Sequence, residues 1–191
     1  MTAAIDIAIL PSPEVSALAI ALSAALPGDE RQGLVLGADC LPHITLTQQF
    51  VPEETMDAFF RAVDRVLRGH PPLHLRVTGG GKGDSSVWMS IARTPQLVAL
   101  HERLLYATRP FEAAAGDASA FWGGEARERD ITWVREFRKK SSFDRFTPHI
   151  TLGHASEPPV VQPMEFVATE IAACDLGRFC ACRRVRRRWM L

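Results

Sequence analysis

The sequence has no long hydrophobic stretch, no excess of charge of either sign and no N-terminal targeting pattern. No run approaches the ~18–20 consecutive apolar residues that cross a bilayer, so we expect no membrane span. The N-terminus lacks a basic segment and carries Asp6 inside its first apolar run, so we expect no secretory signal. Lys plus Arg number 22, and Asp plus Glu also number 22, so the formal net charge is zero. The protein therefore has no overall positive potential that would attract a polyanion. Any contact with nucleic acid must therefore be made at a local site.

Cysteine is also scarce, and its spacing excludes a disulfide framework or a zinc knuckle. One residue separates Cys180 from Cys182, whereas ~2–4 residues separate the paired ligands of a zinc site. The sequence also has no second closely spaced pair of cysteines to complete such a site. Cys40 and Cys174 stand alone. We expect four free thiols in a reducing compartment, and hence a cytoplasmic protein with no metal and no cofactor.

Apolar residues are plentiful enough, at 47%, to bury a sizeable core in one domain over residues 1–191. Helices alternate with strands early in the chain, and strands cluster at its end. This order is typical of an α+β fold, or of an α/β fold with a mixed sheet. Apolar periodicity and capping residues predict helices over 13–26 and 53–68 and a third beginning at Pro95. Alternation predicts strands over 5–10, 34–36, 41–51, 73–78, 87–92, 146–154, 165–176 and 179–190, with a hairpin turn at 79–83.

Two segments are rich in charged residues, one in the second half of the chain and one in the last predicted strand. Residues 111–145 are rich in mixed charge, and we expect a long irregular or partly helical excursion, or a lid. So long an excursion in a compact domain is often functional or mobile. Arg184, Arg186 and Arg188 would share one face of the last strand. They are either a strip that binds phosphate or charges that protect an edge strand.

One pentapeptide occurs twice. Pro42-His43-Ile44-Thr45-Leu46 is repeated as Pro148-His149-Ile150-Thr151-Leu152, 106 residues further on. The surrounding sequence is not of low complexity, so the repeat indicates an internal duplication or two strands selected for one task.

The repeat has a clear chemical meaning if both copies are strands. Histidine and threonine two residues apart then point to one face, while isoleucine and leucine point to the other. Two such strands side by side would bring together His43, His149, Thr45 and Thr151. An imidazole titrates near pH 6.5, so one histidine can act as general base while the other acts as general acid. The threonine hydroxyls can donate to the oxygens of a phosphate.

The paired motifs resemble those of the 2H phosphoesterase superfamily, which includes bacterial 2′-5′ RNA ligase-like proteins and RNA 2′,3′-cyclic phosphodiesterases. The resemblance covers most of the chain and is thinnest in residues 111–145. It implies a bilobal α+β fold in which two pseudo-symmetric lobes, with antiparallel or mixed sheets, face a central cleft. It further implies that His43 and His149 are catalytic and that Thr45 and Thr151 bind the substrate phosphate.

The resemblance also implies a substrate. We expect a metal-independent phosphodiesterase that acts on a 2′,3′-cyclic phosphate or a 2′-5′ phosphodiester of an RNA terminus or nucleotide, with no obligate protein partner. We take His43 as the acid and His149 as the base, although the pseudo-symmetry lets the sequence support either order. Trp88 and Phe50 are candidates for stacking a base, because aromatic side chains hold bases that are not paired. The alternatives are a module that binds RNA ends or nucleotides with little turnover, and a metal hydrolase that uses both histidines and a carboxylate.

Overall fold

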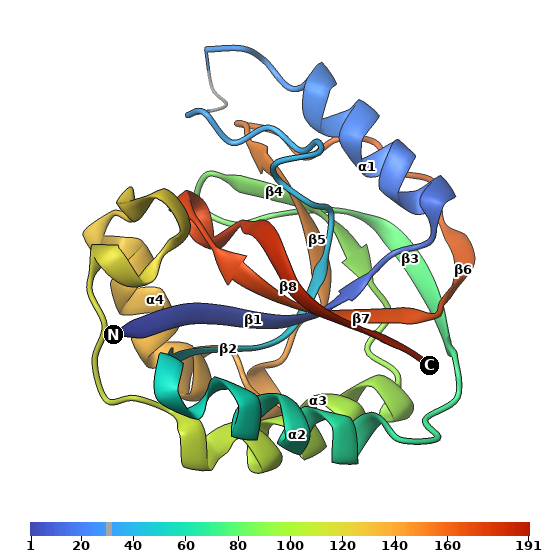
Figure 1. Ribbon diagram of the computed structural model, residues 1–191. Coiled ribbons are helices and arrows are strands. Elements are labelled where there is room, and N and C mark those ends of the chain that lie inside the picture. Colours follow the sequence, from blue (N-terminus) through green and yellow to red (C-terminus); the bar gives the residue numbers. More distant parts are fainter. Residues whose placement is uncertain (30–31) are drawn as a thin grey trace.

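The computed structural model describes residues 1–29 and 32–191, which form two antiparallel sheets with helices around them (Figure 1). The strands are β1 (Thr2–Leu10), β2 (Ile44–Pro52), β3 (Leu73–Lys82), β4 (Ser86–Ile91), β5 (His149–His154), β6 (Met164–Ala168), β7 (Glu170–Leu176) and β8 (Cys182–Met190). The α-helices are α1 (Pro13–Ala25), α2 (Met56–Leu67), α3 (Pro95–Thr108) and α4 (Glu128–Lys140). Short 3₁₀ turns occupy Glu53–Thr55, Arg109–Phe111, Ala118–Ala120, Trp122–Gly124, Phe143–Arg145 and Arg178–Cys180.

The two sheets have the strand orders β2-β1-β7-β8 and β5-β4-β3-β6. Every pairing between the described strands is antiparallel. The prediction of an α+β fold is therefore confirmed, and the alternative of an α/β fold with a mixed sheet is wrong. Each motif strand, β2 or β5, lies at the edge of its own sheet, and the two strands contact each other. The repeated pentapeptides are therefore brought together by two edges that meet.

The helices begin where capping chemistry predicts. The hydroxyl oxygens of Ser12 and Thr94 each accept a hydrogen bond from the backbone N–H three residues further along the chain, and a proline follows each cap. Helices α2 and α3 pack side by side at one end of the molecule, and α1 lies at the opposite end (Figure 1). A single apolar cluster joins residues of both sheets and of these three helices.

Alternate residues of β1 face two different apolar clusters. Ile5, Ile7 and Ile9 point into the cluster shared with the helices, whereas Ala4 and Ala8 point into a smaller one. Residues of the 111–145 excursion, including Phe121 and Val134, cover that second face. The excursion therefore belongs to the packed structure of the first sheet.

Several details differ from the predicted elements, and β2, β5 and β8 each begin three residues later than expected. Residues 34–36 are not a strand, because the Leu36 N–H donates to Ser23 Oγ of α1 at 3.0 Å instead of to a neighbouring strand. Residues 79–82 continue β3 and pair with β4, so the turn comes after them. A Cβ on Gly81 would lie 2.1 Å from Trp88 Nε1, so only glycine leaves room for the indole ring. The predicted strand 165–176 is divided at Thr169 into β6 and β7, which join different sheets.

Both motif strands carry a β-bulge at the same place. In β2, Thr45 pairs with Ala8 and Thr47 with Ile7, which leaves Leu46 as the extra residue. In β5, Thr151 pairs with Trp88 and Gly153 with Val87, which leaves Leu152 as the extra residue. Bulges are frequent beside active sites, where they re-aim side chains. The pseudo-symmetry of the sequence thus extends to an irregularity of the backbone.

Candidate active site

The two motif histidines are held by equivalent hydrogen bonds. His43 Nδ1 lies 2.7 Å from the carbonyl oxygen of Leu41, and His149 Nδ1 lies 2.7 Å from that of Thr147. A carbonyl oxygen can only accept, so each Nδ1 carries the proton and each Nε2 is left for chemistry. In each case the carbonyl belongs to the residue before the motif proline. Residues of this kind are biased toward extended backbone, which suits the approach to an edge strand.

Both pairs of motif side chains line one cleft of about 520 Å³, which also contains Gln48 and Trp88. Burial is the main cause that lowers the pKa of His149. The hydrogen bond to the Thr147 carbonyl opposes it, and His43 lowers the pKa of His149 slightly further. The neutral imidazole is therefore the favoured form of His149.

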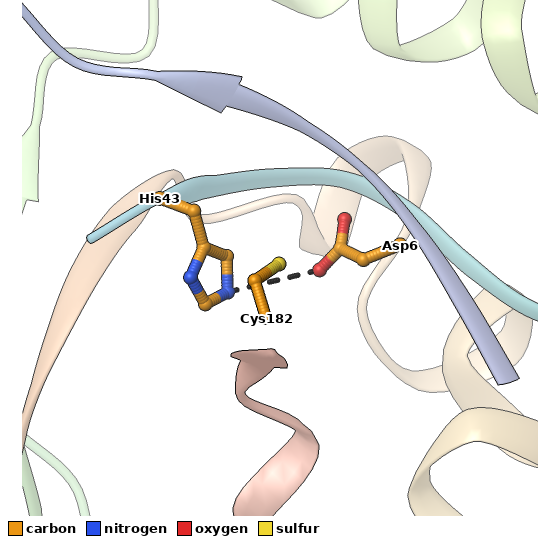
Figure 2. A group of neighbouring side chains, drawn as sticks. All are labelled: Asp6, His43 and Cys182. Carbon is orange, nitrogen blue, oxygen red and sulfur yellow. Dashed lines mark ion pairs between the residues drawn. The ribbon is translucent and has the colours of Figure 1, made fainter. Parts of the chain in front are cut away.

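Asp6 is a site residue that the motif analysis missed. Its carboxylate is fully buried beneath the cleft, where Oδ2 accepts hydrogen bonds from Thr45 Oγ1 at 2.7 Å and Gln48 Nε2 at 2.8 Å. The same oxygen lies 3.8 Å from His43 Nε2, as the dashed line in Figure 2 marks. Burial raises the pKa of Asp6, and His43, Gln48 and Thr45 act in the opposite direction. The available signal was one carboxylate in the middle of an apolar strand.

Asp6 breaks the symmetry between the two histidines. His43 Nε2 lies 3.8 Å from Oδ2 of the Asp6 carboxyl group. His149 instead packs against the indole of Trp88, with ring centroids 5.0 Å apart. The two imidazoles thus have the same tautomer but different neighbours.

The two aromatic candidates for base stacking have different positions. Trp88 lines the cleft, and its indole N–H donates to Ser90 Oγ at 3.1 Å. Phe50 is 1% exposed and packs edge-on against Phe121 in the second cluster. The prediction for Phe50 is wrong because its ring has no open face for a base.

Helix α4 and its N-cap residue Arg127 form one wall of the cleft, to which the helix adds Arg129 and Trp133. Asp130 anchors this wall by accepting from Arg127 Nε at 2.9 Å and from the Phe179 N–H at 3.2 Å. Trp133 is 44% exposed, which is unusual for so large an apolar ring. The excursion therefore supplies an aromatic surface and two cations beside the histidines.

The arginines of β8 are engaged in ion pairs on an edge strand. Arg184 and Arg186 contact Asp175 at 2.6 Å and 2.5 Å, and Arg188 contacts Glu170. Protection of the edge is the interpretation these pairs favour over a strip that binds phosphate.

Two further histidines are close to the motifs. His154 lines the cleft and contacts Ser85 Oγ through Nδ1 at 3.2 Å. His101 is buried, with Nδ1 2.6 Å from the Leu46 carbonyl oxygen. His101 thereby satisfies the carbonyl of the bulged residue in the first motif strand.

Among the described residues, one group offers the donors of a metal site. Asp6, His43 and Cys182 each present a ligand atom within 4.8 Å of the others (Figure 2). The metal hydrolase considered from the sequence required both histidines and a carboxylate, and this group contains only His43. Within the same described part of the chain, no helix is both long and apolar enough to span a membrane.

Comparisons with known proteins agree with this geometry. The family described as the 2′-5′ RNA ligase superfamily matches residues 36–187. Among solved structures, LigT of E. coli complexed with 3′-AMP has a TM-score of 0.65 and 20% identity, covering 100% of this chain and 99% of that one. TT0787 of Thermus thermophilus has a TM-score of 0.60 and 19% identity, with 98% and 97% covered. A structure described as a phosphoesterase has a TM-score of 0.60 and 19% identity, with 100% and 99% covered. No curated protein matches the chain.

An α+β fold with one histidine motif on each of two sheets defines the class of protein. The chain belongs to the 2′-5′ RNA ligase superfamily, the 2H phosphoesterases, as the paired motifs predicted. Membership of this superfamily supports a phosphodiesterase-type activity. The likeness to the solved structures shows the shared fold.

Proposed function

We propose that this protein is a metal-independent phosphodiesterase that hydrolyses a 2′,3′-cyclic phosphate, or a 2′-5′ phosphodiester, at an RNA terminus or on a nucleotide. The observation that carries the proposal is the pair of imidazoles in one cleft, each with Nδ1 held by a carbonyl and Nε2 left for chemistry. Two groups of this kind can remove a proton from water and supply one to a leaving oxygen in the same displacement. The proposal is also supported by solved complexes of E. coli LigT, a protein of the same fold, with 3′-AMP, phosphate and ATP.

The surroundings of the two histidines support an order of roles. His149, which favours the neutral form, accepts a proton from water as the water oxygen attacks phosphorus. The phosphorus bond to one ribose oxygen breaks, and His43, beside the Asp6 carboxylate, donates the Nε2 proton to that oxygen. For a cyclic phosphate the product is a nucleoside phosphomonoester, and no electron transfer or metal is required.

The threonines would bind the non-bridging oxygens of the phosphate. Thr151 lines the cleft beside His149. The Thr45 hydroxyl donates to Asp6, so it would turn away from this carboxyl group to donate to a phosphate. Trp88 and Trp133 line the same cleft and would stack the base, and Arg129 of α4 would attract a further phosphate.

The test is hydrolysis of a panel of nucleoside 2′,3′-cyclic phosphates and 2′-5′ dinucleotides, with the phosphomonoester product identified. We expect His43→Ala and His149→Ala each to lower kcat by about 10²–10⁴-fold, and EDTA to leave turnover intact. The pH profile should be bell-shaped, with an acidic limb below the ordinary titration of histidine because burial lowers the pKa of His149. His74→Ala, on the exposed face of β3, is the matched control. Full activity in either motif variant would refute the two-histidine mechanism.

The second candidate is a module that binds RNA ends or nucleotides with little turnover. The exposed Trp133 at the cleft favours it, because an aromatic surface of this kind is suited to holding a ligand. Tight binding of a 2′-phosphorylated nucleotide without product from any substrate of the panel would establish the module and exclude the enzyme.

A further inference from the structure

Beneath the cleft, three side chains from separate parts of the chain bring different ligand atoms to one point. They are the Asp6 carboxylate of β1, the His43 imidazole before β2 and the Cys182 thiol at the start of β8, all within 4.8 Å of one another. In Figure 2 the imidazole points toward the carboxylate, and the sulfur lies beside the line that joins them. The motif spacing of the sequence could not reveal this group, because it forms only when β8 docks.

The backbone holds two of these residues in place before any ligand arrives. The Leu41 N–H donates to the Cys182 carbonyl oxygen at 2.9 Å, and the Leu41 carbonyl accepts from His43 Nδ1 at 2.7 Å. The second bond also fixes the tautomer in which His43 Nε2, the nitrogen that faces Asp6, can bind a cation.

The donor set suits zinc. Nitrogen, sulfur and oxygen ligands from His, Cys and Asp are those that Zn²⁺ takes in proteins, whereas Mg²⁺ requires oxygen ligands. An aspartate and a thiolate together balance the charge of a divalent ion, so the buried group would become neutral. The Asp6 oxygen that faces His43 is Oδ2, which also accepts from Thr45 and Gln48. The buried Oδ1 has no hydrogen-bond partner among the described residues.

Access to this group is from the cleft. The His43 side chain is 12% exposed and lines the cleft, while Asp6 and Cys182 are fully buried beneath it. Zinc held by three protein ligands takes water as its fourth ligand.

We propose that Asp6, His43 and Cys182 form an inhibitory zinc site at the floor of the cleft. Binding forms bonds from the metal to carboxylate oxygen, imidazole Nε2 and sulfur, and it breaks the S–H bond of Cys182, whose proton passes to solvent. No oxidation occurs. The metal occupies the nitrogen from which His43 would deliver its proton, so turnover stops. The inhibition rests on the proposed function, whereas the binding does not.

The binding is tested with Co²⁺ as a spectroscopic probe and Zn²⁺ in titration calorimetry, on the full chain. We expect one ion per chain, a thiolate-to-cobalt charge-transfer absorption, displacement of Co²⁺ by Zn²⁺ and no binding of Mg²⁺. Cys182→Ser should abolish that absorption and weaken Zn²⁺ binding at least ~10-fold. Cys40→Ser is the matched control, because Cys40 also lines the cleft but is not one of the three. Circular dichroism checks that both variants fold.

The inhibition is tested by titrating Zn²⁺ into the hydrolysis assay. We expect EDTA to restore turnover, and Cys182→Ser to keep basal activity but require at least ~10-fold more Zn²⁺ for inhibition. Wild-type protein without a thiolate-to-cobalt absorption would overturn the site without reference to any variant. An absorption lost in Cys40→Ser and kept in Cys182→Ser would overturn the assignment of the sulfur ligand. Zinc that binds the three residues and leaves turnover unchanged would overturn the inhibition. Wild-type protein that hydrolyses nothing would contradict the proposed function, while the binding measurement stays decisive for the site.

Discussion

Acid should destabilise the protein through His101, the histidine that supports the first motif strand. Its Nδ1–H donates to the Leu46 carbonyl at 2.6 Å, and its Nε2 accepts from the Phe143 N–H at 3.1 Å. The ring stacks on Phe146 with centroids 3.9 Å apart and is fully buried. Protonation would place a second donor against the Phe143 N–H, so the fold requires the neutral ring.

Burial is the main cause that lowers the pKa of His101 from 6.5 to about 4. The unfolded chain therefore takes up this proton at higher pH than the folded chain. The stability is fully present above about pH 6.5 and is lost as the pH falls toward 4. The whole shift corresponds to about 3 kcal/mol at most, of which about 2 kcal/mol is lost by about pH 5.

The assay is urea unfolding of wild type and His101→Gln, followed by tryptophan fluorescence at about pH 7.5 and about pH 5. We expect the wild type to lose about 2 kcal/mol more than His101→Gln between these conditions, because the variant lacks the titrating ring. His74→Gln, on an exposed position of β3, should lose as much as the wild type. Equal pH dependence in the wild type and His101→Gln would refute the reasoning.

Two further predictions concern the cleft. Asp6→Asn replaces the carboxyl group 3.8 Å from His43 Nε2 by a neutral amide that has one acceptor oxygen instead of two, so we expect kcat to fall by about 10²-fold or more with little change in KM. Unchanged kcat in a folded variant would show that Asp6 has no part in positioning. Trp133→Ala removes an exposed ring of α4, so we expect binding of a nucleotide to weaken by about 1–3 kcal/mol in calorimetry, and an unchanged dissociation constant would exclude stacking at this position.

Local signals in the sequence predicted much of the fold. Ser12 and Thr94 located the starts of two helices, because a capping hydroxyl acts on residues only three positions away. The pentapeptide located both motif strands, and the family resemblance brought them to one cleft. The division of 165–176 at Thr169 was beyond such signals, because apolar residues at alternate positions do not tell which sheet a strand joins.

The same limit applies to the site. His43 and His149 were found because they are repeated, whereas Asp6 and Cys182 have no counterpart in the second motif. Their proximity to His43 depends on the order of strands in the first sheet. Phe50 was misplaced because a phenylalanine in a strand can face either the core or the cleft, and only the packing of residues 111–145 over this sheet decides which.

The order β2-β1-β7-β8 has a consequence for protein synthesis. The first sheet combines the earliest strands of the chain with the latest, and the carbonyl that holds the Leu41–His43 segment belongs to Cys182. A chain emerging from the ribosome contains both histidines well before β8 has been made. The Leu41 N–H gains its acceptor only after β8 has been made and has docked, so the segment that carries His43 is anchored later than the strand that follows it.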